Sequence, residues 1–114
     1  MVFEAAQEIT EHGHAMVETF QIQRHRNSDN LHLRLIGAFD KEAALSLIEA
    51  LNENRDLVKK VFVHTAALNQ LLDSGVELFR RHLGSLDRPG AEIVFTGKKG
   101  EQIALKAPGI RFMR

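Results

Sequence analysis

The chain has 114 residues, a length that suits one domain with a single hydrophobic core. Fifteen Lys and Arg residues balance fifteen Asp and Glu residues, so no overall positive field favours nucleic acid, and no apolar run reaches the roughly 18 residues of a membrane span. Because the chain lacks cysteine and its N-terminus lacks the pattern of a secretory signal, we expect no thiol chemistry and a cytoplasmic protein.

The first residues differ in character from the rest of the chain. Residues 1–18 carry a short apolar pattern interrupted by "HGH", which predicts an N-terminal appendage before one domain at 19–114. In "TFQIQRH", Phe20 and Ile22 share a face, the alternation typical of a half-buried strand. After the turn signal "RNSDN", the alternation in "LHLRLIG" predicts the antiparallel partner of that strand.

A helix and a buried strand are predicted next. Asp40 stands where an N-cap is expected, and the apolar residues after it recur at helical spacing, so an amphipathic helix should end near Asn54. Val61, Phe62 and Val63 are apolar without alternation. This pattern predicts a strand in the centre of the sheet that is buried on both faces.

The remainder of the chain continues the alternation of helices and strands. A loop leads to a second helix, whose apolar stripe consists of Leu72, Val76, Phe79, Leu83 and Leu86. "AEIVFTG" predicts a strand, "KKGEQIALKA" a short helix and "PGIRFM" a last strand. The expected order is β-β-α-β-α-β-α-β, an α/β fold in which helices pack on a mixed sheet.

Three motifs in this order resemble those of the STAS domain, named for sulfate transporters and anti-sigma-factor antagonists. They are "LRLIGAFD", "VFVHTAALNQLLDSGVELF" and "GAEIVFTG", and the resemblance extends from about Thr19 to Met113. It implies a STAS-like fold and a bacterial, non-enzymatic regulatory protein. Gly75 matches the family glycine, and Ser74 matches the residue that a partner kinase phosphorylates.

The resemblance also implies a partner and a surface for it. The partner would be an anti-sigma factor with serine-kinase activity, and ATP would belong to that kinase, so that the domain itself needs no cofactor. The implied partner surface consists of Leu72, Asp73, Ser74, Gly75, Glu77, Arg80 and Arg81. Gly75 has no Cβ and would let a partner's backbone approach closely.

Ser74 also has a structural interpretation that needs no partner. The spacing of Ser74 and Glu77 fits a capping box, in which the serine hydroxyl accepts a hydrogen bond from the amide of Glu77. Such a cap stabilises a protein by about 0.5–2 kcal/mol. The phosphorylation site and the helix cap therefore stay open as alternatives.

Two positions depart from the STAS pattern and support other functions. Leu72 and His64 stand where the family has acidic residues, which favours a module that binds without phosphate, such as a scaffold, an oligomer (for example a homodimer) or a transport-complex subunit. His64 lies at the carboxyl end of the expected central strand, where α/β sheets gather ligands. It is predicted either to bind a ligand or sense pH, or to be tied to nearby loop backbone.

Nothing in the sequence matches a known catalytic or metal-binding motif. A nucleophile elbow, a Walker A loop, a dinucleotide fingerprint and a zinc-ligand spacing are all missing, so no catalytic residue, metal or cofactor is assigned. The basic pairs Arg80-Arg81 and Lys98-Lys99 are expected to be solvated. The alternative is that they help to form a surface that binds an acidic partner.

Overall fold

A computed structural model describes residues 20–82, 90–104 and 110–113. Within these residues the chain forms three helices and six strands. They are, in chain order, β1 (Gln21–Arg26), β2 (Asn30–Phe39), α1 (Lys41–Asn54), β3 (Lys60–His64), β4 (Leu68–Leu71), α2 (Asp73–Arg81), β5 (Glu92–Thr96), α3 (Lys98–Ala104) and β6 (Ile110–Met113).

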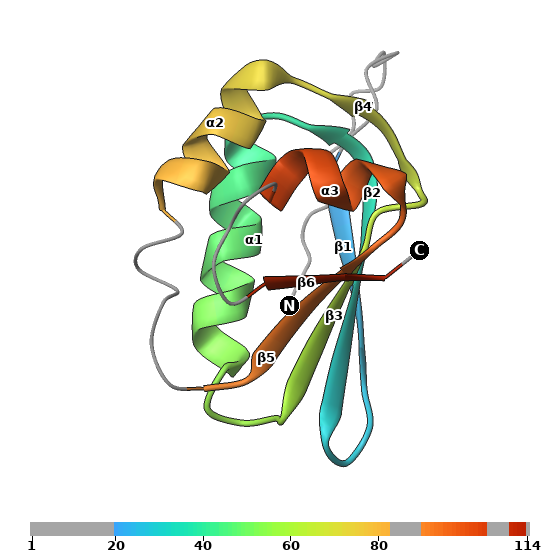
Figure 1. Ribbon diagram of the computed structural model, residues 1–114, viewed down its shortest axis with the longest axis vertical. Helices are drawn as coiled ribbons and strands as arrows, with labels where there is room; N and C mark the ends of the chain where they lie inside the picture. Colours follow the sequence, from blue (N-terminus) through green and yellow to red (C-terminus); the bar gives the residue numbers. More distant parts are fainter. Residues whose placement is uncertain (1–19, 83–89, 105–109, 114) are drawn as a thin grey trace, which may run out of the picture.

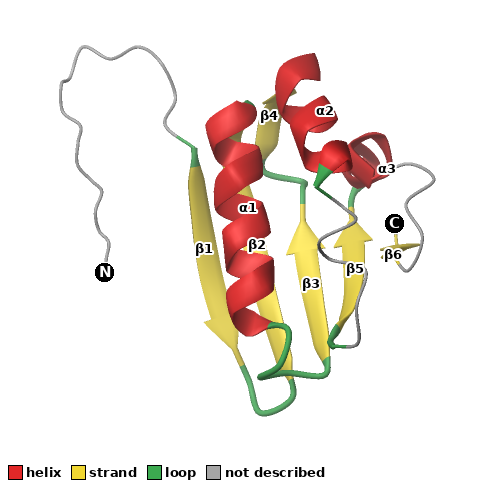
Figure 2. Ribbon diagram, turned by 90° about the vertical axis from the view of Figure 1, so that its left-hand side faces the viewer, coloured by secondary structure: helices red, strands yellow, loops and turns green. Residues whose placement is uncertain are grey.

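The strands form one mixed sheet. Its order is β1-β2-β3-β5-β6, in which β1 is antiparallel to β2 and the other neighbours are parallel. α1 and α2 lie on one face of the sheet, and α3 lies beyond the end of β5 next to α2 (Figures 1 and 2). The expected α/β architecture is confirmed.

One strand was not predicted. β4 lies in the stretch expected to be a loop, and it pairs in parallel with residues 37–39 at the end of β2. A four-residue strand is too short to show a period, and its pairing depends on a distant segment. The rest of the predicted element order is confirmed.

The sheet has one covered face and one face without helices among the described residues. Side chains that alternate along β2, β3 and β5 pack under the helices and are almost fully buried: Leu31, Leu33, Leu35, Val61, Val63, Ile93 and Phe95. β3 is central, as expected, but its predicted burial on both faces is wrong. Phe62 and His64 are half-buried because they point to the face that no helix covers.

Three phenylalanines join the helices to the sheet. Phe79 of α2 lies with its ring centroid 6.3 Å from that of Phe39 and 5.8 Å from that of Phe95, and both pairs meet edge to face. All three side chains are fully buried. Such pairs stabilise by about 0.5–1.5 kcal/mol beyond the burial of their area, so Phe79 fixes the position of α2.

A side chain caps the start of α1, whereas none caps the start of α2. Asp40 caps α1 as predicted, because its Oδ1 accepts from the amide of Ala43 at 2.9 Å. α2 begins at Asp73 and ends at Arg81, and its predicted continuation to Leu86 lies outside the described residues.

The appendage predicted at residues 1–18 also lies outside the described residues. No helix in the described part of the chain has both the length and the apolar character needed to cross a membrane.

Gly75, in the first turn of α2, touches the junction of β2 and α1. A Cβ at this position would lie 2.5 Å from the carbonyl oxygens of both Phe39 and Asp40. Neither oxygen is free to move, because the first accepts from the amide of Leu72 at 3.1 Å and the second from the amide of Ala44 at 3.0 Å. The close contact therefore requires glycine.

We predict that Gly75→Ala lowers the free energy of unfolding by about 1–3 kcal/mol, the usual cost of overpacking a closed contact. Alanine's better helix propensity, about 0.5–1 kcal/mol, does not offset this loss. Urea denaturation measures the change, with Ser74→Ala at the adjacent exposed position as the control. Equal stability of Gly75→Ala and the unmodified protein would contradict the close contact.

Candidate functional site

The first turn of α2 presents Ser74 to solvent. Leu72 is the N-cap, and no side chain caps the helix. The carbonyl of Leu72 accepts from the amides of Gly75 at 3.0 Å and Val76 at 3.1 Å, so Ser74 already lies inside the helical turn. The Ser74 side chain is exposed and has no hydrogen bond to another described residue.

The predicted capping box is therefore wrong. A capping serine has an extended backbone and stands just outside the first turn, whereas here that place belongs to Leu72, with φ −99° and ψ 136°. The seating of Gly75 against the β2–α1 junction sets where the helix begins. The spacing of Ser74 and Glu77 fits a cap, but it cannot show this long-range contact.

The predicted partner residues share one surface, with one exception. Five of the seven are exposed on α2, and Leu72 is half-buried at its start; the exposed ones are Asp73, Ser74, Glu77, Arg80 and Arg81. Gly75 is buried, and its missing Cβ makes room for the chain's own Phe39 and Asp40. The interpretation that this glycine admits a partner's backbone is corrected accordingly.

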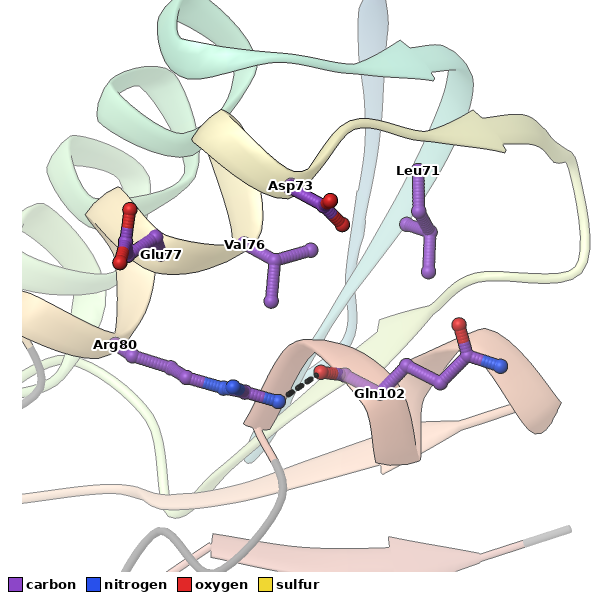
Figure 3. A pocket seen from close by; sticks show the side chains of 6 residues that line it. All are labelled: Leu71, Asp73, Val76, Glu77, Arg80 and Gln102. Atoms are coloured by element: carbon purple, nitrogen blue, oxygen red, sulfur yellow. Dashed lines mark hydrogen bonds between the residues drawn. The ribbon is translucent and has the colours of Figure 1, made fainter.

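A groove of about 510 Å³ opens between α2 and α3, beside this surface. Its lining comprises Leu71, Asp73, Val76, Glu77, Arg80 and Gln102. Figure 3 shows Asp73, Val76 and Leu71 directed into the space from one side, while Arg80 crosses to α3. There its Nη2 donates to the carbonyl oxygen of Gln102 at 2.8 Å, which links the two helices.

Three of the groove residues were not predicted. Leu71 lies in the unexpected β4, Val76 was assigned only to the apolar stripe, and Gln102 is on α3. Their common surface depends on α3 lying beside α2, which no local pattern encodes. The Lys98-Lys99 pair of α3 does not line the groove.

His64 belongs to a second cluster, on the face of the sheet without helices. Its Nε2 lies 2.9 Å from Nδ1 of His32, and its Nδ1 lies 2.7 Å from Oγ1 of Thr96. The two imidazole planes are within 2° of parallel, and the ring of Phe62 stacks beside His32 at 4.8 Å. A chain of hydrogen bonds thus crosses β2, β3 and β5.

This arrangement replaces the expected tie between His64 and loop backbone. His64 is the last residue of β3, as predicted, but its partners are side chains on the neighbouring strands. Along β2, His32 alternates with leucines, so its side chain points to the other face of the sheet. Its contact with His64 depends on the parallel register that pairs β2 with β3. The lining of the groove between α2 and α3 includes neither His64 nor Ser74.

The environment of His64 disfavours its charged form. Partial burial is the larger cause that lowers the pKa of His64 below its ordinary value of 6.5. The charge of the neighbouring His32 lowers this pKa further. Other charged or titratable side chains on this face include His25, Arg34, Lys60, Glu92 and Arg111, and Arg34 is hydrogen-bonded to Gln23. The neutral ring is therefore the form that suits the fold.

Comparison with known proteins identifies the fold. No protein-family profile matches the sequence, and no curated protein sequence matches it significantly. The anti-sigma factor antagonist SpoIIAA in its unphosphorylated form matches with a TM-score of 0.52 and 17% identity over 84% of this chain and 88% of SpoIIAA. A DUF3478-family protein from Shewanella loihica PV-4 with a SpoIIAA-like fold matches with a TM-score of 0.52 and 14% identity over 83% of this chain and 86% of that protein.

A third match concerns a small part of a larger protein. The crystal structure of Mglu matches with a TM-score of 0.55 and 22% identity over 64% of this chain, but over 18% of Mglu. At these identities the comparisons establish the fold. The chain has a SpoIIAA-like, STAS-type fold, as the sequence motifs predicted.

We predict that Ser74→Ala changes the free energy of unfolding by no more than about 0.5 kcal/mol, because the serine is exposed and caps nothing. Asp40→Ala removes a true cap and should cost about 0.5–2 kcal/mol. Urea denaturation of the two variants compares the sites directly. A loss at Ser74 as large as that at Asp40 would restore the capping box.

We predict that the protein loses stability as the pH falls below 6.5. Because the folded protein lowers the pKa of His64, the unfolded chain binds the proton more readily, and the stability present above pH 6.5 declines until the folded pKa is passed. Urea denaturation between pH 7.5 and 5.5 measures the slope. The slope should be smaller in His64→Gln than in the unmodified protein, and equal slopes in the two proteins would contradict the assignment.

Proposed function

We propose that this chain, which has the fold of an anti-sigma factor antagonist, is a non-enzymatic interaction domain that binds a protein partner through α2. The domain comprises residues 19–114, preceded by the appendage at 1–18, and acts in the bacterial cytoplasm. The observation that supports this function best is the exposed Ser74 hydroxyl on a helical turn that Gly75 holds in place.

The partner proposed is an anti-sigma factor with serine-kinase activity. A kinase must reach the acceptor oxygen, and the hydroxyl of Ser74 is exposed and engaged by no other described residue. The kinase would transfer the γ-phosphoryl group of ATP to Ser74 Oγ and release ADP. The unphosphorylated domain would bind the anti-sigma factor and thereby free a sigma factor.

Phosphorylation would weaken that complex through charge. A phosphoserine carries about −1.5 to −2 charges and would stand next to the carboxylates of Asp73 and Glu77. The positive end of α2 would favour the phosphate by about 0.3–1 kcal/mol, too little to reshape a turn held by Gly75. The switch would thus act at the interface and leave the fold unchanged.

A second candidate uses the same surface without phosphate. Leu72 and His64 stand at positions where the STAS family has acidic residues, and here Leu72 is a half-buried N-cap while His64 bonds to His32 and Thr96. Neither side chain is available to assist phosphorylation of Ser74. This favours a scaffold, a homodimer or a transport-complex subunit as the alternative.

Mass spectrometry of the protein purified from its native host, together with its bound partners, tests the proposal. Trypsin releases residues 61–80, and fragment ions should place a phosphate on Ser74 and none on the fully buried Thr65. A peptide that stays unmodified in all growth conditions, although a serine kinase is recovered, would leave the phosphate-independent alternative.

We predict that Ser74→Asp weakens binding of the recovered partner about tenfold or more, or roughly 1.4 kcal/mol, while Ser74→Ala binds like the unmodified protein. Ser46→Asp is the matched control, since Ser46 is also an exposed helical serine but lies on α1. Titration calorimetry measures the three affinities. Equal weakening by both aspartates would show an effect of net charge rather than of the α2 surface.

A further inference from the structure

Two acidic residues line the groove, Asp73 and Glu77, and Asp73 is the one whose side chain has no bonding partner in the described part of the chain. Oε1 of Glu77 lies 4.0 Å from Nη2 of Arg81, and Arg80 donates a hydrogen bond to the carbonyl oxygen of Gln102. The Asp73 carboxylate has neither a hydrogen bond nor an ion pair with another described residue. The groove therefore presents a carboxylate that no described side chain pairs with, next to the positive end of α2, while the guanidinium of Arg80 is held at the carbonyl of Gln102.

The walls beside Asp73 are apolar. Leu71 and Val76 are half-buried, and both are directed into the groove with Asp73 (Figure 3). A purely apolar occupant would remove water from the carboxylate without replacing its hydrogen bonds, which is unfavourable. An acidic occupant would face Asp73 and Glu77. A cation on an aliphatic stem satisfies both the walls and the charge.

We propose that the groove between α2 and α3 receives an arginine side chain of the protein partner. The aliphatic stem would lie on Leu71 and Val76, and the planar guanidinium would pair with the Asp73 carboxylate through two parallel hydrogen bonds. This inference rests on the proposed function, because it specifies the chemistry of the partner that binds α2. It does not depend on phosphorylation of Ser74.

NMR titration of the ¹⁵N-labelled chain with N-acetyl-arginine amide tests the groove without any partner. Saturable shifts are expected at the amides of Leu71, Asp73, Val76 and Gln102, with a dissociation constant on the order of millimolar, as for a single side chain. N-acetyl-citrulline amide has the same shape without the charge and should produce no such shifts. Equal binding of the two probes, or shifts elsewhere alone, would overturn the proposal.

Two variants identify the carboxylate. Asp73→Asn should weaken the arginine probe at least fivefold while its spectrum shows an intact fold, whereas Glu49→Gln, at an exposed carboxylate on α1, should bind as before. Unchanged binding by Asp73→Asn would overturn the inference. Ser74→Asp should still bind the probe, so failure of the phosphate switch and failure of the arginine site are distinguishable.

Discussion

The contact between Gly75 and the backbone of Phe39 and Asp40 determines how the candidate site is built. At this point the end of β2, the cap of α1 and the first turn of α2 meet with no room for a methyl group. The same two carbonyls accept hydrogen bonds from Leu72 and Ala44, so each helix start holds the other. The orientation of Ser74 and Asp73 therefore follows from a backbone contact to which neither side chain contributes.

The fold separates two clusters of polar residues that lie close together in the sequence. Between His64 and Ser74 the chain passes through β4, which crosses to pair with the end of β2. His64 then faces the sheet surface on which the described residues place no helix. Ser74 belongs to α2, which lies with α1 on the other surface (Figure 2). The candidate phosphorylation site at Ser74 and the hydrogen-bonded pair of His64 and His32 therefore lie on opposite sides of the sheet.

The elements with strong local signals could be predicted from the sequence. The hairpin alternates, Asp40 is a favourable cap, and the short apolar runs of β3 and β5 favour strands, although the run of β3 did not show which of its residues face the helices. The start of α2 could not be predicted, because a serine three residues before a glutamate fits a cap wherever the helix begins. The strand β4 could not be predicted either, because its pairing depends on a distant segment. Likewise, Gln102 and His32 join their sites through the packing of α3 and the register of β2, which are properties of the whole fold.

The chain from His32 through His64 to Thr96 has a consequence for where its protons reside. A neutral His64 with its proton on Nε2 donates to His32 and accepts from the Thr96 hydroxyl, whereas the other tautomer reverses both directions. Each state satisfies every hydrogen bond, and so does a His64 that carries one extra proton. The link between β2, β3 and β5 therefore does not depend on which ring nitrogen of a neutral His64 carries the proton, provided that His32 and the Thr96 hydroxyl adopt the matching orientation.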